Sequence, residues 1–184
     1  MSPDLNNTSY VILGLLDVHP KSGYDIKSVA DHSTRYFWAI SYGQIYPELT
    51  RLQGLGYVEL DSESTAGRAR RVFRITPRGR AALKEWLAEP GEDSYELRDE
   101  LFLKLFFADT PETKLNLVRR MRARHQATLA ALRGVEAHVK TLPNKPHGGM
   151  EVLRGGFRLH QAYLDYCDEL EAELSKEKAP AHTS

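Results

Sequence analysis

The 184-residue sequence predicts a mainly α-helical protein, with one two-stranded hairpin in its N-terminal part and helices alone in its C-terminal part. Apolar residues recur at helical spacing through most of the chain, whereas residues 57–63 and 70–75 alternate as strands do. The stretch EPGEDS combines acidic residues with Pro and Gly and marks a boundary. We therefore expect domains at 1–88 and 97–175, a linker at 89–96 and a flexible tail at 176–184.

Two helices are predicted at the start of the chain. Residues 8–18 (TSYVILGLLDV) are strongly apolar, with Asn7 or Thr8 as the N-cap and Pro20 as the stop. Residues 22–33 open with the capping-box pair Ser22-x-x-Asp25, and apolar residues follow at helical spacing. The connector TRYFWAI (34–40) is too apolar for a solvated loop, so we expect it to pack.

A third helix is predicted from about Ser41, although it carries Gly43 and Pro47, which cost a helix interior about 1 and 3 kcal/mol. On a helical wheel the apolar residues form one face, made of Ile45, Leu49 and Leu52. The opposite face is nearly bare and comprises Gly43, Pro47, Thr50, Arg51 and Gly54. A bare face lets a helix backbone approach another surface, such as a major groove about 12 Å wide.

Ser41-x-x-Gln44 has the spacing of a capping box, which anchors the helix start against the proline. Capping by itself explains both residues. Residues at the N-terminal end of such a helix are also the ones that reach bases and phosphates in helix-turn-helix proteins, so the two roles are compatible.

A run of cations without acidic neighbours covers the predicted hairpin and the helix after it. The whole chain has 25 basic and 25 acidic residues, which makes this run distinctive. Its members are Arg68, Arg70, Arg71, Arg74, Arg78, Arg80 and Lys84. The hairpin, tipped by Gly67, Arg68, Arg70 and Arg71, and the helices before it predict a winged helix-turn-helix whose wing arginines lie against DNA phosphates or in a minor groove. The alternative is a solvated hairpin tip.

The remaining arginines of this run fall on different faces of a strand and a helix. Arg74, Arg78 and Arg80 are therefore expected to be peripheral to the interface. Thr76-Pro77 supplies a cap and an N1 proline for a fourth helix at 78–87.

The C-terminal part is predicted to contain a short helix and two long ones. Residues 97–108 are apolar on most sides and should be buried, and a long helix at 111–142 is broken by LPNKPHGG before another at 150–174. A helix of about 30 residues spans about 45 Å, enough to set two winged helices one DNA turn of about 34 Å apart. We expect dimerisation through Leu101, Phe102, Leu153, Phe157, His160, Leu164 and Cys167. The alternative is that the stripe at 153–174 packs only within its own chain.

Composition and motifs argue against several other classes of protein. No apolar run approaches the ~20 residues of a membrane helix, and no signal peptide is recognisable. A single cysteine, Cys167, allows no intrachain disulfide, which is typical of a cytoplasmic protein. The seven histidines show no metal-ligand spacing, and no nucleophile or phosphate-binding motif is present, so we expect no enzyme, cofactor or metal.

Four segments together resemble the PadR family of bacterial transcriptional regulators: YVILGLLDVHPKSGYDIK, SYGQIYPELTRLQGLGYVE, GRARRVFRITPRGRAALKEWL and ELRDELFLKLFFA. The long helical C-terminal part is similar to the virulence-activator subgroup. The resemblance implies a homodimer on an inverted-repeat operator, usually acting as a repressor and in some members relieved by a small aromatic ligand.

By motif position, the resemblance implies that Ser41, Tyr42, Gln44, Tyr46 and the wing residues Arg68, Arg70 and Arg71 face DNA. We add Arg51 from the outward face of the third helix. Many relatives have Thr or Ser-Thr where this chain has Tyr42-Gly43-Gln44, so their base preference does not transfer.

Two questions stay open at this level. A winged helix can bind protein without DNA, and the balance of 11 basic and 12 acidic residues through Tyr95 mildly favours that reading, whereas the arginine cluster opposes it. Several aromatic residues could line an effector pocket between domains or across a dimer, or could simply be core. They are Trp38, Trp86, Phe106 and Tyr163, with Phe37 and Phe102 nearby in the sequence.

Overall fold

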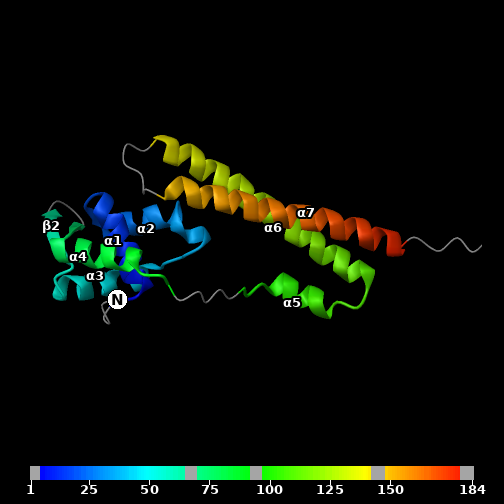
Figure 1. Ribbon diagram of the computed structural model, residues 1–184, viewed down its shortest axis with the longest axis horizontal. Coiled ribbons are helices and arrows are strands. Elements are labelled where there is room, and N and C mark those ends of the chain that lie inside the picture. Colours follow the sequence, from blue (N-terminus) through cyan, green and yellow to red (C-terminus); the bar gives the residue numbers. More distant parts are fainter. Residues whose placement is uncertain (1–4, 65–69, 92–96, 142–147, 179–184) are drawn as a thin grey trace, which may run out of the picture. The chain divides into compact units, whose positions relative to one another are not determined.

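The computed structural model describes residues 5–64, 70–91, 97–141 and 148–178. These residues form seven α-helices, one 3-10 turn and three short strands, shown in Figure 1. They belong to two compact units, with the boundary in the chain between Asp93 and Ser94. Each unit is described by itself below.

The first unit begins with two helices whose starts are fixed by reciprocal caps. Helix α1 (Asn7–Val18) is capped by Asn6, whose side chain accepts from Ser9 N at 3.0 Å, so the cap lies just before the expected Asn7 or Thr8. Helix α2 (Gly23–Asp31) begins with the predicted capping box of Ser22 and Asp25. Both boxes satisfy backbone N–H groups that a helix start leaves without partners.

The connector after α2 is more exposed than we expected. It contains a single 3-10 turn, η1 (Thr34–Tyr36), and Phe37 is 61% exposed and Trp38 42% exposed. Only Ile40 of this connector is buried.

Helix α3 (Tyr42–Gly54) packs on α1 and α2 and leads into the sheet. Strands β2 (Val58–Ser64) and β3 (Arg70–Ile75) form the predicted antiparallel hairpin, with a register shift between Leu60 and Ser62. The sheet has a third strand that was not expected. Strand β1 (Lys21–Ser22) pairs with Phe73 and Val72 on β3, giving the order β1-β3-β2.

Helix α4 (Pro77–Ala88) closes the first unit and is capped by Thr76, whose hydroxyl accepts from Gly79 N at 3.1 Å. A side chain at Gly79 would place its Cβ 2.2 Å from the Tyr57 carbonyl oxygen, so only glycine fits there. The core under these elements is one apolar cluster. Its fully buried members include Ile12, Leu13, Leu16, Ile26, Ile45, Leu49, Leu52 and Val58.

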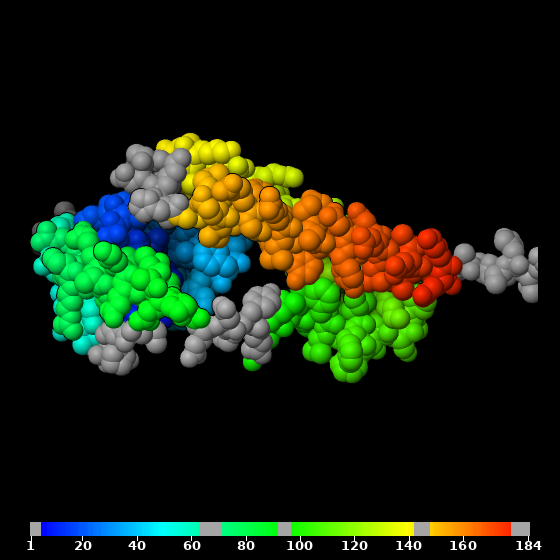
Figure 2. Space-filling view, in the orientation of Figure 1, coloured from blue at the N-terminus to red at the C-terminus, as the bar shows by residue number. Residues whose placement is uncertain are grey.

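The second unit contains α5 (Glu100–Phe107), α6 (Pro111–Thr141) and α7 (Gly149–Lys178). Helices α6 and α7 form a long antiparallel pair (Figure 1), with Val139 and Met150 in one shared apolar cluster and Met121 and Cys167 in another. In Figure 2 α5 and the first half of α6, in green, lie against the orange and red half of α7. Of the described helices, none is long and apolar enough to cross a membrane.

Two expectations for this unit are wrong. Helix α5 is not buried, because its two faces meet different surroundings: Leu101 is covered, whereas Phe106 is 82% exposed and Phe107 74% exposed. The stripe on α7 is covered by α6 of the same chain, so Leu153 and Cys167, like Leu101, offer no surface to a second chain. The other residues expected at the dimer interface are half-buried: Phe102, Phe157, His160 and Leu164.

Candidate nucleic-acid interface

One face of α3 is exposed and nearly free of side chains. Ile45, Leu49 and Leu52 are buried on the inner face, whereas Gly43 and Pro47 on the outer face are exposed, with Thr50 and Gly54. Nothing in the first unit requires a glycine at 43, because an added Cβ would meet only Ser41 Oγ at 3.8 Å. The bare surface therefore has no role in packing within the unit.

The start of α3 has the predicted capping box. The Gln44 side-chain oxygen accepts from Ser41 N at 2.9 Å and from Ser41 Oγ at 3.0 Å. These bonds use only the oxygen of the Gln44 amide, so its NH₂ group is the part that can donate outward. The helix start also carries the positive end of the helix dipole, which favours anions such as phosphate.

A row of three exposed tyrosines crosses from α2 to α3 beside this bare face. The Tyr24 and Tyr42 rings lie 6.4 Å apart and the Tyr42 and Tyr46 rings 6.1 Å apart, with planes inclined by only 20° and 18°. Lys27 Nζ lies 5.7 Å from the centre of the Tyr42 ring. We name Tyr24, Tyr42, Tyr46 and Lys27 the tyrosine row.

Sequence reasoning found two members of the tyrosine row and missed Tyr24 and Lys27. The signal was present, because the Ser22 cap fixes the phase of α2, and residues 24 and 27 then share a face at i, i+3 spacing. What the sequence did not reveal was the crossing of α2 and α3. At this crossing Gly23 lies under Tyr46, where an added Cβ would come within 2.7 Å of the ring.

Arg51 does not extend outward from α3 as expected. Its Nε and Nη2 donate to the two carboxylate oxygens of Glu48, at 2.9 and 2.7 Å, and Nη2 also donates to Ser9 Oγ at 3.1 Å. Ser9 belongs to α1 and is fully buried, and it donates its own hydroxyl proton to Glu48. Arg51 therefore helps to join α3 to α1.

The wing contributes Arg71, which is exposed at the start of β3. Its Nη2 donates to Gln53 Oε1 at 3.0 Å, and its guanidinium lies 5.2 Å from the centre of the Phe73 ring. These contacts hold a positive charge beside the C-terminal end of α3. Arg68 lies outside the described residues, and of Arg70 the structure describes only its pairing with Ser64.

The arginines expected to be peripheral each have a partner within the first unit. Arg74 pairs with Glu59 and Asp61, and Arg80 pairs with Asp17. Arg78 donates to the Leu55 carbonyl at 2.8 Å. Arg71 thus differs from Arg74 and Arg80, which pair with carboxylates, because its hydrogen bond is to a neutral amide on α3.

Comparison with known proteins gives the family. A model of the PadR-like transcriptional regulators matches residues 12–85, and one of the C-terminal domain of virulence activators matches residues 97–175. A probable transcriptional regulator of Mycobacterium tuberculosis is 31% identical over 186 aligned positions, which cover 92% of this chain and 97% of that protein. The chain belongs to the PadR-like family of transcriptional regulators.

Solved structures agree with this assignment. The structure of Bacillus subtilis PadR in complex with operator DNA matches with a TM-score of 0.81 and 25% identity, covering 92% of this chain and 99% of that one. The virulence activator AphA of Vibrio cholerae matches with a TM-score of 0.70 and 27% identity, covering 93% and 99%. This chain is therefore a PadR-type regulator with a winged-helix DNA-binding domain.

The aromatic residues expected around an effector lie in different surroundings in this PadR-like chain. Trp86 stacks on Tyr10 in the first unit, with ring centres 4.5 Å apart, and Trp38 is exposed on the connector. In the second unit the ring centres of Tyr163 and Phe102 are 5.9 Å apart. Those of Phe106 and Phe107, which meet edge-on, are 5.0 Å apart.

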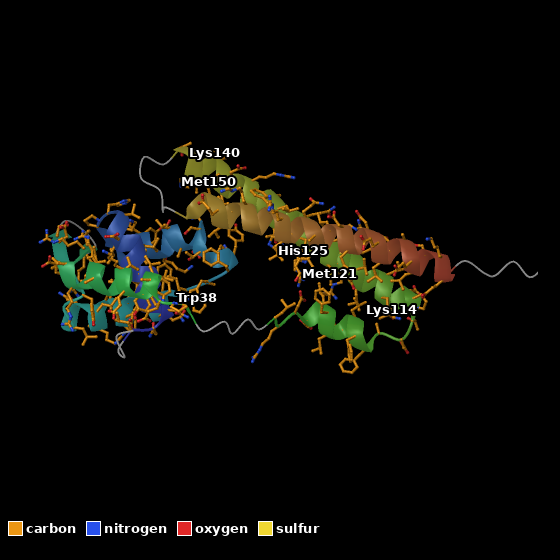
Figure 3. All side chains as sticks on the ribbon, viewed as in Figure 1. Trp38, Lys114, Met121, His125, Lys140 and Met150 are labelled. Atoms are coloured by element: carbon orange, nitrogen blue, oxygen red, sulfur yellow. The ribbon has the colours of Figure 1, made fainter. Side chains whose placement is uncertain are left out.

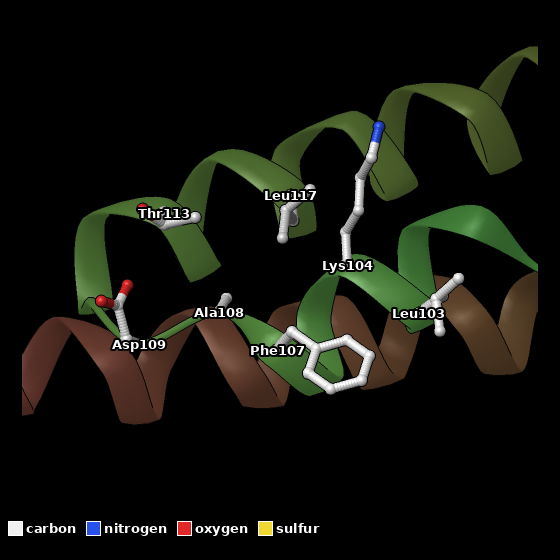
Figure 4. A pocket seen from close by; sticks show the side chains of 7 residues that line it. All are labelled: Leu103, Lys104, Phe107, Ala108, Asp109, Thr113 and Leu117. Atoms are coloured by element: carbon white, nitrogen blue, oxygen red, sulfur yellow. The ribbon is translucent and has the colours of Figure 1, made fainter.

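Two apolar hollows lined by described residues of the second unit lie beside α5. One, of about 310 Å³, is lined by Phe102, Leu159, Ala162, Tyr163 and Tyr166. The other, of about 480 Å³, lies between α5 and α6, and Figure 4 shows Leu117 of α6 on one side of it and Phe107 of α5 on the other. Both hollows are open, so each suits a flat apolar group or a side chain of another molecule.

Proposed function

We propose that this PadR-like regulator binds an inverted-repeat operator as a homodimer, represses transcription there, and is released by a small aromatic ligand. The observation that carries the proposal is the bare outer face of α3, flanked by the tyrosine row and by Arg71. A helix with a bare face fits a major groove closely, and a neighbouring cation adds phosphate contacts that do not depend on sequence.

Within this proposal each residue has a task. Ser41 and Gln44 lie at the helix start, where the Gln44 NH₂ group can donate to a base edge. Tyr42 and Tyr46 present hydroxyls and ring faces to the backbone and to thymine methyl groups. Arg71, with Arg68 and Arg70, neutralises phosphates beside the wing.

The proposed dimer rests on the exposed side of α5. Phe106 and Phe107 are mostly exposed, and Leu103 lines the hollow of Figure 4 together with Phe107. A contiguous apolar surface of this kind typically marks an interaction site. A two-fold dimer presents two identical winged helices, which matches the symmetry of an inverted repeat.

Repression and ligand release are supported by a relative. The Bacillus subtilis protein, 25% identical to this chain, is named a negative transcriptional regulator. Its structure has been solved with operator DNA and also with p-coumaric acid. In this chain the apolar hollow at Phe102 and Tyr163 is a candidate site for such a planar ligand.

The test uses the purified full chain and the DNA upstream of its own gene. We expect a footprint with two-fold symmetry, an affinity that falls steeply with salt, and two protein chains per site. A panel of planar aromatic acids should include one that releases the DNA. Absence of salt-dependent DNA binding would reject the proposal and favour a protein-binding winged helix.

A further inference from the structure

The second unit contains a pair of histidines at the junction of its three helices. His125 on α6 is only 4% exposed, and His160 faces it from α7. Their Nδ1 atoms lie 2.8 Å apart, a hydrogen-bonding distance. Figure 3 places His125 and Met121 on the same stretch of α6, and both side chains are buried.

The neighbouring arginine determines which nitrogen of each ring carries the proton. Arg124 Nη2 lies 3.3 Å from His125 Nε2, and because a guanidinium can only donate, Nε2 must be the acceptor. The single proton of neutral His125 is therefore on Nδ1, where it is donated to His160 Nδ1. His160 in turn carries its proton on Nε2. The contact requires both rings to be neutral.

The same arginine connects the histidines to the start of α5. Arg124 binds Asp99 through both ends of its guanidinium, with Nη1 donating to Oδ1 at 3.0 Å. Asp99 is the N-cap of α5 and accepts from Leu101 N at 2.9 Å. A continuous chain of polar contacts thus runs from α5 through Arg124 and His125 to His160 on α7.

Aromatic rings pack beside this series of polar contacts. Tyr163 stacks on His125 with ring centres 4.2 Å apart and planes inclined by 15°, and Phe102 of α5 contacts Tyr163. The His125 ring is therefore connected to α5 through two sets of contacts. One runs through Arg124 and Asp99, and the other through Tyr163 and Phe102.

We propose that the His125–His160 contact is an acid-sensitive latch, which holds α5 on α6 and α7 when both rings are neutral and releases it when either ring is protonated. A proton on His125 Nε2 points at the Arg124 guanidinium, and a proton on His160 Nδ1 points at the N–H of His125. Either event replaces a hydrogen bond by a repulsive contact. The Tyr163 ring would attract a protonated His125. The Arg124 guanidinium, with Nη2 3.3 Å from His125 Nε2, repels it more strongly.

The charges around the pair set the pH range. The titratable and charged groups that face it are Arg124 on α6, Asp99 ahead of α5, and Tyr163 and Cys167 on α7. Burial, with Arg124 and His160 adding to it, lowers the pKa of His125 from 6.5 to about 4. Burial and Arg124 also lower the pKa of His160. The pKa of Asp99 is lowered by its bond from Arg124, so its charge does not change in the same range.

The direction of the effect follows from these pKa values. Once released, His125 regains a pKa near 6.5, so the released state binds more protons than the latched state between pH 6.5 and about 4. The latch is therefore fully held above pH 6.5 and weakens as the pH falls. Between pH 7.5 and 5.5 the His125 proton alone shifts the equilibrium towards release by about tenfold.

Hydrogen exchange of the full chain tests the latch without DNA. After correction for intrinsic exchange, we expect residues 100–107 to lose about tenfold in protection between pH 7.5 and 5.5, while α3 in the first unit does not change. Equal protection of α5 at both pH values would overturn the latch.

Substitutions identify the groups responsible. In the double variant His125→Asn/His160→Asn one amide can donate to the other, neither titrates, and the pH response should disappear. His138→Asn is the matched control, because His138 is exposed on the same helix, and it should keep the full response. A full response in the double variant would refute the latch. If that variant does not fold, His125→Gln alone should remove the tenfold change assigned to the His125 proton, and an unchanged response would count against the latch.

One consequence rests on the proposed function. Because α5 carries the surface proposed for dimerisation, acid should also shift the sedimentation mass towards the monomer and lower DNA affinity. If acid lowers the protection of α5 but the chain is already a monomer at pH 7.5, the proposed dimer is rejected and the latch still stands.

Discussion

Arg51 and Glu48 form a bidentate ion pair on the inner edge of α3, and Ser9 of α1 is hydrogen-bonded to both side chains. Burial raises the pKa of the Glu48 carboxyl, but the bonds from Arg51 and Ser9 outweigh burial and leave that pKa below its ordinary value. The carboxylate therefore stabilises the first unit at neutral pH and loses this contribution as acid protonates it below pH 4.5. The pair fixes α3 to α1.

Glu48→Gln should lower the free energy of unfolding of the first unit by about 1.5–3 kcal/mol, the usual value of a hydrogen bond to a charged group. Denaturant unfolding at pH 7 measures it. Glu59→Gln is the control, because Glu59 is exposed and pairs with Arg74 at the surface, where less than about 1 kcal/mol is expected. Equal losses in the two variants would show that the buried network has no special role.

Gly43→Glu should abolish DNA binding while the fold stays intact. Residue 43 lies in the first turn of α3, where a negative charge and a better helix former than glycine both favour the helix. The same side chain would place bulk and negative charge against phosphate. Gly43→Ala is the control, with binding largely kept, and gel shifts with thermal unfolding measure both effects. Normal DNA affinity in Gly43→Glu would show that this face does not meet DNA.

Arg71→Ala should weaken binding to all DNA sequences and reduce the slope of log K against log salt by about one. Fluorescence anisotropy titrations at several salt concentrations measure the slope. Arg74→Ala is the control, since Arg74 is already paired with Glu59 and Asp61 and its loss should leave the slope nearly unchanged. If only Arg74→Ala altered the slope, the proposed position of the wing on DNA would be wrong.

Gly23→Ala tests the tyrosine row. The added methyl group would lie 2.7 Å from the Tyr46 ring, so the half-exposed ring must move away from its present position. We expect several-fold weaker operator binding with a loss in stability of about 1 kcal/mol or less, because the ring can move towards solvent. Gly14→Ala on α1 has open space around its Cβ and should bind normally. The tyrosine row has no part in binding if both variants behave alike.

Phe106→Ser combined with Phe107→Ser should convert the proposed dimer to monomers. Burying one such side chain contributes about 1.5–3 kcal/mol, so losing two should weaken association by at least about a hundredfold. Sedimentation velocity measures the mass. Leu87→Ser in the first unit removes an equally exposed apolar side chain and should leave the mass unchanged. A dimer that survives the double substitution must use another surface.

Local chemistry explains which parts of the fold were predictable. The capping pairs at Ser22/Asp25 and Ser41/Gln44, the cap at Thr76 and the apolar spacing of α3 all act within one or two turns, and the structure confirms each of them. Strand β1 was missed because two residues are too few to show alternation. Its partner on β3 lies about 50 residues away in the chain.

Features that depend on tertiary contacts were harder to predict from the sequence. Periodicity identified the apolar stripe on α7, but it does not say whether α6 of the same chain or a second chain covers it. For the same reason α5 looked buried, although half of it is exposed. In the candidate site, Arg51 was misplaced because its partner Ser9 is remote in sequence, and Tyr24 joins Tyr42 only where two helices cross.

The short strand β1 has a mechanical consequence for the recognition of DNA. Lys21 and Ser22 are bonded to the edge of β3, Ser22 is also the cap of α2, and the Lys21 ammonium donates to two carbonyl groups at the end of α1. A tilt of the hairpin would therefore break these contacts or move α1 and α2 with it. For the proposed function we therefore expect the duplex, rather than this unit, to deform wherever the groove does not fit α3 and the wing.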